Sequence, residues 1–385
     1  MFITLVTFII VLSVLVFAHE MGHFWTARKF GVKAEEFGFG FPPRIGGIYK
    51  NEQGQWKTVW GSKEVKDAPG TVYSLNWLPL GGFVKIKGEN GDNEDEPDSF
   101  ASKKIWQRAI MLSAGVVMNI VLAAVLFSFG FMIGLPQGVE GINPRAIVSD
   151  QKVQIAQVLP DSPAKQAGLE MGDFVIGVND NKFTTDEELQ NFVGTRAGEE
   201  LNYKISRGGE ELSFKITPEL REDTGRGGIG IAIATTGLVK YPWYMAIWEG
   251  IITTIFLTWA IMLAFYDLFK DLILGQGLSA DIAGPVGIAT ITGRFAHMGF
   301  IYLLNFTALL SINLAILNFI PFPALDGGRI LFLIIEKIKG SPVKRELENV
   351  IHNTGFIILM LLVLAVTWRD VARLGDVFKG ILNRL

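Results

Sequence analysis

Residues 5–23 read LVTFIIVLSVLVFAHEMGH, an almost unbroken apolar run that ends in a cluster of ionisable side chains. A helix needs roughly 20 apolar residues to cross a bilayer core, so the run predicts a membrane-spanning helix. His19 and His23 are four residues apart and share one face of that helix, where both imidazoles can bind one Zn²⁺. Glu20 lies beside them as a candidate general base.

The position of this cluster indicates a function. An ionisable side chain at membrane depth costs about 2.5 to 3.5 kcal/mol on insertion scales, so such groups need a reason to be there. The alternative is a surface helix with two incidental histidines. The chain has only 4 histidines, and two of them fall at the metal-binding spacing, which favours the metal site.

The composition predicts a membrane protein with substantial parts in water. Of the 385 residues, 49% are hydrophobic and 19% are charged. The formal net charge is −3 and the basic residues are scattered, which excludes nucleic acid as a partner. The chain has no cysteine, so any metal must be held by His, Asp or Glu.

A catalytic zinc site typically takes three protein ligands and a water, so two histidines leave it one ligand short. Asp326 is the best candidate for the third ligand. It follows another apolar span, whose helix must be broken by Pro321 and Pro323. Irregular backbone at membrane depth needs protein or a cavity around it. The alternative is a plain helix-ending Asp-Gly-Gly turn, but together with the pentad His19-Glu20-Met21-Gly22-His23 the ligand interpretation is favoured.

Hydropathy predicts four spans, at residues 2–24, 105–133, 300–320 and 351–366. A fifth apolar stretch, residues 245–265, is interpreted as interfacial or only partly embedded. Topological parity is the reason. If that stretch crossed fully, the first and third spans would be antiparallel, and Asp326 would lie on the opposite face from the histidines.

Basic residues set the expected orientation. They gather in residues 28–104 and 337–345, which we therefore place in the cytoplasm, with the N-terminus and residues 136–299 outside. Residues 89–98 are strongly acidic and are interpreted as a solvated linker. Residues 150–220 differ from the rest. They predict a small soluble α+β module, with strands at 153–158 and 173–179 and a helix at 185–192 opened by a capping box.

The pentad and the later Leu325-Asp326-Gly327-Gly328 segment resemble the bacterial site-2 protease family of intramembrane zinc metalloproteases. The closest subgroup is the sigma-factor-regulating proteases. This chain has room for a single PDZ-like module, and it carries Val116 where the family usually has proline. The resemblance covers nearly the whole chain and includes residues 38–43, 78–85, 284–286, 160–164 and 167–169.

The resemblance implies one Zn²⁺ per chain, held by His19, His23 and Asp326, with Glu20 as the base that activates a zinc-bound water. It also places Asn313 and Asn318 near the metal as donors to the oxyanion. Five residues separate them, about 140° around a regular helix, which suits that role only if the helix is distorted. Hydrogen bonding between helices is the alternative role for both.

A helical substrate must be unwound before its backbone can be attacked. The β-forming residues 78–87 predict an exposed strand edge for this purpose, to which a substrate adds as a strand, and residues 36–45 predict a hairpin dipping into the bilayer. The edge is assigned to Gly81, Gly82, Phe83 and Val84.

In the PDZ-like module, the loop with Gly228, Ile229 and Gly230 is a candidate site for a peptide carboxyl terminus. The same stretch is alternatively a glycine-rich closing strand. We prefer the module's role as a size filter that admits only substrates already trimmed outside.

The sequence thus predicts a polytopic α-helical protein of the bacterial cytoplasmic (inner) membrane, with about four spans, a membrane-associated β-hairpin or sheet and one extracytoplasmic α+β PDZ-like domain. The predicted activity is cleavage of a single-span protein, an anti-sigma factor or a signal-peptide remnant, after an upstream site-1-type protease. The alternatives are a catalytically silent adaptor with structural zinc and, less well supported, an ion transporter. The predicted segments are 1–24, 25–104, 105–135, 136–236, 237–299, 300–328, 329–350 and 351–385.

Overall fold

The structure is a computed structural model that describes residues 2–63, 65, 68–91, 93–221, 225–275 and 283–382. The chain divides into two compact units. The larger unit comprises residues 1–125, 252–293 and 306–385, and it contains the pentad. The smaller unit comprises residues 126–251 and 294–305, and it contains the PDZ-like module.

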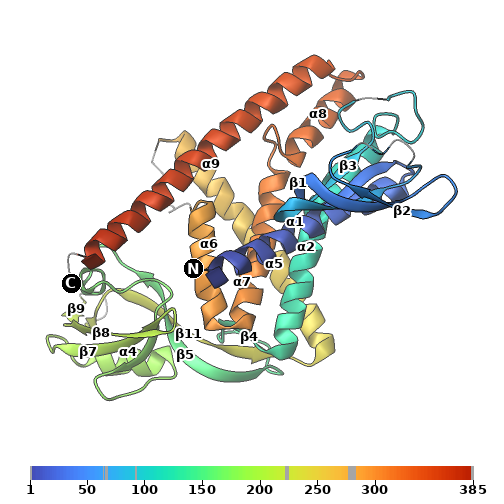
Figure 1. Ribbon diagram of the computed structural model, residues 1–385. Coiled ribbons are helices and arrows are strands. Elements are labelled where there is room, and N and C mark those ends of the chain that lie inside the picture. Colours follow the sequence, from blue (N-terminus) through green and yellow to red (C-terminus); the bar gives the residue numbers. More distant parts are fainter. Residues whose placement is uncertain are drawn as a thin grey trace. The chain divides into compact units, whose positions relative to one another are not determined.

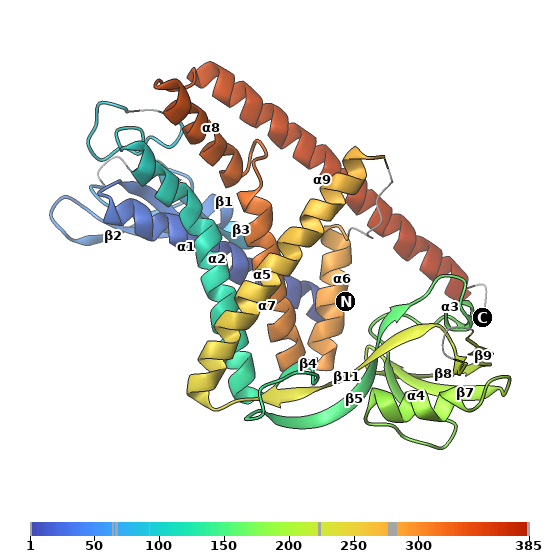
Figure 2. The same cartoon turned by 180° about the vertical axis from the view of Figure 1, so that it is seen from behind.

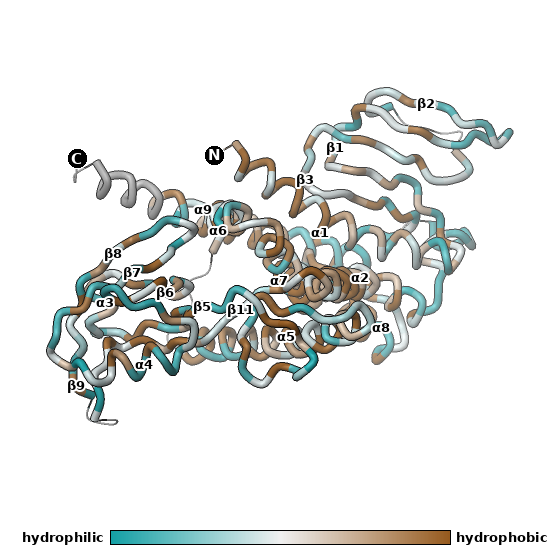
Figure 3. The backbone as a smooth tube through the Cα atoms, turned by 90° about the horizontal axis from the view of Figure 1, so that it is seen from below, coloured by the Kyte–Doolittle hydropathy of each residue, from teal (hydrophilic) through white to brown (hydrophobic). Residues whose placement is uncertain are grey.

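Five helices among the described residues are long and apolar enough to cross a membrane. Four of them coincide with the predicted spans, and Figure 3 shows apolar residues along α1, α2 and α7. The fifth, α5, contains residues 245–265 and meets the same criterion, so the interfacial placement of that stretch stays a prediction. The five helices are α1 (Phe2–Lys29), α2 (Ile105–Ile133), α5 (Trp243–Ile273), α7 (Phe300–Phe319) and α9 (Arg345–Leu382).

A helix between α5 and α7 was not predicted. It is α6 (Pro285–Met298), and Figure 2 shows it after α5 along the chain. Our parity argument counted only full spans. α6 has 14 residues and is not among the five helices long enough to cross. Only if α6 also crossed could α1 and α7 run in the same direction with α5 as a full span, so the parity argument for an interfacial α5 stays a prediction.

A three-stranded sheet lies beside α1 in the larger unit (Figure 1). Its strands are β1 (Ala34–Lys50), β2 (Trp56–Trp60) and β3 (Val72–Ile86). Phe37 pairs with both Tyr73 and Val84, so the first half of β1 lies between the two halves of β3. Residues 82–86 therefore form one edge of the sheet, and β2 forms the other. Gly81 and Gly82 are buried, so this part of the edge is not exposed as the sequence predicts.

The predicted hairpin at residues 36–45 is wrong in its pairing. Its two arms do not pair with each other, because residues 73–76 of β3 lie between them: Gly38 and Gly47 both pair with Ser74. The bend contains Pro42 and Pro43, which lack the amide donors that a tight two-residue hairpin uses. The chain instead turns back through a wider bend within β1, and residues 73–76 of β3 lie between its two arms.

The acidic segment 89–98, whose residue 92 lies outside the described residues, is exposed at residues 90 and 93–97, as expected of a solvated linker, and it also forms ion pairs. Glu89 pairs with Arg329, and Glu94 pairs with Arg345. Lys87 bonds Glu96 and also Asp98, whose Oδ1 lies 2.8 Å from Lys87 Nζ. That hydrogen bond holds the pKa of Asp98 below its ordinary value. Arg329 and Arg345 are remote in sequence from this segment, so the local charge pattern alone does not predict those two pairs.

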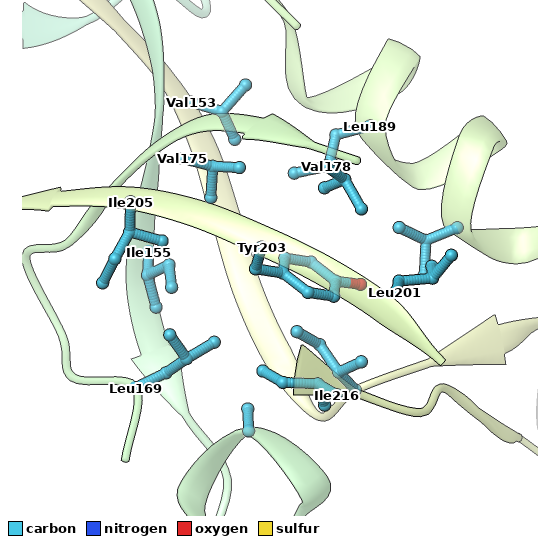
Figure 4. Packing of buried hydrophobic residues seen from close by; sticks show 13 residues of the cluster. Val153, Ile155, Leu169, Val175, Val178, Leu189, Leu201, Tyr203, Ile205 and Ile216 are labelled. Atoms are coloured by element: carbon cyan, nitrogen blue, oxygen red, sulfur yellow. The ribbon is translucent and has the colours of Figure 1, made fainter. Parts of the chain in front are cut away.

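The smaller unit contains a six-stranded antiparallel sheet in the order β4-β11-β5-β6-β7-β8. Figure 4 shows its apolar core, in which Tyr203 lies among aliphatic side chains. The strand predicted at 153–158 is confirmed as part of β5, and the strand predicted at 173–179 is confirmed as β6, which is one residue shorter at each end. The strands are β4 (Leu135–Gly138), β5 (Ile147–Val158), β6 (Phe174–Val178), β7 (Leu201–Arg207), β8 (Glu210–Ile216) and β11 (Ile231–Lys240), with a separate pair β9 (Glu219–Leu220) and β10 (Gly227–Gly228).

Two short helices cover this core. In α3 (Pro163–Ala167), the Ser162 side chain accepts a hydrogen bond from the Lys165 amide, and Gly168 ends the helix at a φ of 92°. In α4 (Asp186–Gly194), the Thr185 side chain caps the Glu188 amide. The predicted helix at 185–192 is therefore confirmed.

Candidate metal centre

Three side chains from the two ends of the chain bring their donor atoms together. His19 and His23 belong to α1, and Asp326 is the first residue of α8 (Asp326–Lys339). Asp326 Oδ2 lies 3.0 Å from His19 Nε2 and 3.4 Å from His23 Nε2. The two Nε2 atoms are 3.2 Å apart. A tetrahedral Zn²⁺ bound at about 2.0–2.1 Å holds its ligands about 3.3 Å apart, so the three separations fit such an ion.

The environment of these donors also fits a cation. Both histidines are buried, each at 7% exposure. Asp326 Oδ2 is buried as well and has no hydrogen-bond partner among the described residues, although both Nε2 atoms are close to it. Buried polar atoms are rarely left unpaired. A divalent ion between the three atoms accounts for this arrangement.

Glycines allow the backbone to approach the site closely. A Cβ at Gly22 would meet the carbonyl oxygen of Ala114 in α2, and one at Gly115 would meet the rings of both histidines. The contact therefore requires glycine on both helices. Although Val116 replaces the family's usual proline, α2 is a continuous helix through this point.

Glycines also shape the start of α8. A Cβ at Gly327 would meet the carbonyl oxygens of Phe319 and Ile320, and one at Gly328 would meet that of Phe322. The first turn of α8 thus packs directly against the loop that follows α7. The two glycines after Asp326 are needed to bring this aspartate to α1.

Hydrogen bonds orient the two imidazoles. His23 Nδ1 lies 2.8 Å from the carbonyl oxygen of Met111 in α2. With the proton on Nδ1, that bond directs the Nε2 lone pair toward the cluster. His19 Nδ1 lies 3.5 Å from the amide nitrogens of both Asn119 and Asn318.

Asn119 was not predicted as a site residue. Its Oδ1 is buried without a partner in the described part of the chain. Turning the amide over places Oδ1 against His19 Nδ1–H, which gives both atoms a partner. Ser311 of α7 donates to the Asn119 carbonyl at 2.8 Å, so α7 and α2 are tied together beside the metal cluster.

Glu20 connects the cluster to the sheet. Its Oε2 accepts a hydrogen bond from the Val84 amide at 3.1 Å. Val84 belongs to the edge segment of β3, so the predicted base and the predicted substrate strand are in direct contact.

The sequence profile of peptidase family M50 matches residues 7–60 and 62–362 of the chain. The chain belongs to peptidase family M50. The zinc metalloprotease RasP of Geobacillus kaustophilus (strain HTA426) is 31% identical, and the match covers 96% of this chain and 98% of the relative. The regulator of sigma-W protease RasP of Bacillus subtilis (strain 168) is 30% identical, and the match covers 96% and 99%. A PDZ domain of an SdrC-like protein from Listeria monocytogenes matches 23% of this chain and 92% of its own, at 23% identity and a TM-score of 0.21.

These matches confirm the family resemblance read from the motifs. This M50 peptidase is a metalloprotease of the site-2 type. Because its relatives are named zinc metalloproteases, zinc is the metal that the cluster is expected to hold.

The edge strand of this M50 peptidase is anchored to α1. Ser13 donates from Oγ to the Pro79 carbonyl at 3.0 Å and accepts from the Gly81 amide at 3.3 Å. Gly81 has a φ of 93°, and a Cβ there would meet the side chain of Val16. Ser13 was not predicted, although a buried serine within an apolar run is a recognisable signal.

The two asparagines of α7 differ in their contacts. Asn318 lies near His19, as described above. Asn313 donates to the Leu309 carbonyl of its own helix at 2.9 Å. Two asparagines do lie at His19, but the second is Asn119 of α2, because α7 is a regular helix and its residues 313 and 318 face different directions.

The glycine-rich loop of the PDZ-like module lines a pocket of about 480 Å³. Gly228, Ile229 and Gly230 lie at this pocket, together with apolar residues of α4 and β11 and two arginines. The other lining residues include Leu189, Val193, Ile231, Ile233, Arg221 and Arg226. Gly227 and Gly228 form the short strand β10, so the alternative of a glycine-rich strand holds for part of this loop.

If Asn119 orients His19, Asn119→Leu lowers zinc affinity by about 10- to 100-fold, the usual effect of losing the hydrogen bond behind a metal-binding histidine. Competition with a chelator on the detergent-purified protein measures this. Asn313→Leu is the matched control, because Asn313 bonds only Leu309 in the described structure, and we expect its zinc affinity to be unchanged. Equal affinity in Asn119→Leu and the wild type contradicts this role.

Proposed function

We propose that this M50 peptidase hydrolyses a peptide bond within the transmembrane helix of a single-span protein, with His19, His23 and Asp326 as zinc ligands. The observation that carries the proposal is the convergence of three donor atoms from α1 and the start of α8 beside Glu20, where α1 and the α7 helix that precedes α8 are apolar enough to cross a membrane. Bound Zn²⁺ lowers the pKa of its water to about 7 and polarises the substrate carbonyl.

Glu20 is proposed as the general base. Its carboxylate accepts the proton of the attacking water and then protonates the leaving nitrogen. Asn318 is proposed as the donor to the oxyanion, because its amide lies at the cluster, whereas the amide of Asn313 bonds the backbone of its own helix.

The edge of β3, from Gly81 to Val84, is proposed to bind the unwound substrate as an added strand. The Val84 amide points away from β1 and donates to Glu20. When a substrate strand is added here, one of its carbonyl oxygens accepts the hydrogen bond from the Val84 amide in place of Glu20. Binding then releases the Glu20 carboxylate, which couples substrate entry to the availability of the base.

The substrate class and the trimming step are also proposals. The Bacillus subtilis relative is named a regulator of sigma-W protease, which supports an anti-sigma factor as the substrate, with a signal-peptide remnant as the alternative. We further propose that an upstream site-1-type protease trims the substrate first. The enzyme is proposed to lie in the bacterial cytoplasmic membrane, with its N-terminus and its PDZ-like module on the outer side.

Glu20→Gln is expected to lower cleavage of a single-span reporter in proteoliposomes by at least about 100-fold, since the base is lost, while bound zinc is retained. Zinc content by mass spectrometry and reporter cleavage measure the two effects separately. Cleavage near the wild-type rate with full zinc content contradicts the role of Glu20, and it favours a zinc site that only supports structure.

Val84→Pro is expected to lower cleavage by about tenfold or more, because proline removes the amide donor that faces the substrate. Val84→Ala is the matched control, since it shortens the side chain and keeps the amide. Zinc content is expected to be equal in both variants. If Val84→Pro cleaves as fast as Val84→Ala, the substrate does not add at this edge.

Removing residues 140–235 is expected to allow cleavage of a substrate that keeps its outer domain. Gly138 of β4 pairs with Thr236 of β11. An inserted Asn-Gly turn can therefore join these two strands after the deletion and keep their pairing. The assay compares full-length and trimmed substrates with the intact and the shortened enzyme. If the shortened enzyme cleaves trimmed substrate and still rejects full-length substrate, the module is not the size filter.

A further inference from the structure

We propose that His352 of α9 is a positioning residue that fixes Asp326 in the metal centre by holding the backbone amide of Ala324. This inference rests on the proposed role of Asp326 as a zinc ligand. His352 is not a member of the metal cluster, so its effect is transmitted through the loop that precedes Asp326.

The loop between α7 and α8 is short and strained. α7 ends at Phe319 and α8 begins at Asp326, and the intervening residues include Pro321 and Pro323. Ala324 has a φ of 79°, in the left-handed region that residues with a Cβ rarely adopt. Such a conformation persists only where the surrounding structure holds it.

The start of α8 lacks a side-chain cap of its own. Its N-cap residue is Leu325, whose side chain has no group to accept a hydrogen bond from the first turn. Contacts of the preceding loop with other elements therefore contribute to the position of Asp326, the next residue.

His352 supplies such a contact. The Ala324 amide donates to His352 Nδ1 at 2.9 Å. An accepting Nδ1 in a neutral imidazole leaves the proton on Nε2, so the ring acts here as an acceptor. The ring of Phe332 in α8 lies 5.3 Å from the His352 ring, centroid to centroid, and packs against it.

A second contact lies three residues further along the same face of α9. A Cβ at Gly355 would come within 2.7 Å of the Pro323 carbonyl oxygen, so the helix backbone itself lies against the loop. The loop is thus enclosed by Gly327 and Gly328 of α8 on one side and by His352 and Gly355 of α9 on the other. His352 provides the hydrogen bond in this enclosure.

His352→Leu tests the inference, because leucine fills the space and accepts no hydrogen bond. We expect zinc affinity of the full-length, detergent-purified protein, measured by chelator competition, to fall about 10- to 100-fold. His352→Asn is the conservative variant, since its Oδ1 can occupy the place of Nδ1, and we expect it to stay within about threefold of the wild type. If the leucine variant does not fold, His352→Ala replaces it in the comparison.

His297→Leu is the matched control, a histidine of α6 that lies outside the metal cluster. Wild-type zinc affinity in His352→Leu or His352→Ala, or equal losses in those variants and His352→Asn, overturns the inference. Asp326→Ala is measured alongside. If Asp326→Ala also leaves zinc affinity unchanged, the proposed ligand set itself has failed; if it weakens binding while His352→Leu does not, only the positioning role has failed.

Discussion

The structure depends on one constraint: donor atoms from α1 and from the first residue of α8, which follows the third predicted span, must meet at one point. Both histidines are buried there, so a misplaced imidazole would lose its water partners, and each imidazole needs a protein partner on its other nitrogen. The Met111 carbonyl oxygen lies against His23 Nδ1, and the Asn119 amide lies near His19 Nδ1. Glycines at the contacts of α1 with α2 and of α8 with its own loop remove the side chains that would otherwise keep these ligands apart.

The same constraint links catalysis to substrate entry. A membrane helix presents no free carbonyl, so an enzyme that cuts it must offer the unwound chain a new hydrogen-bonding partner. The β3 edge lies against the helix that carries the pentad, tied to it by Ser13 at one end and by Glu20 at the other. The proposed base and two of the three proposed metal ligands therefore belong to α1, and the proposed substrate strand is tied to the same helix.

The local sequence pattern predicts the two histidines of the metal cluster and most of the apolar helices. The four-residue spacing indicates His19 and His23, and hydropathy finds the helices, because both depend on residues near each other along the chain. Asn119, Ser13 and His352 were missed, since their roles depend on how helices pack. The pairing within residues 36–45 was mispredicted because a strand from elsewhere enters between the arms. Asn313 illustrates the same limit. The sequence gives its spacing from Asn318, but it does not show that the second amide near His19 comes from Asn119 of α2.

Zinc-edge X-ray absorption spectroscopy of the purified enzyme tests the central claim most directly. Our account predicts a single zinc environment with two imidazole nitrogens and oxygen donors at about 2.0–2.2 Å, and loss of the imidazole scattering in the double variant His19→Ala/His23→Ala. A zinc ion with one imidazole ligand or none in the unaltered protein, or imidazole scattering that survives in the double variant, contradicts it.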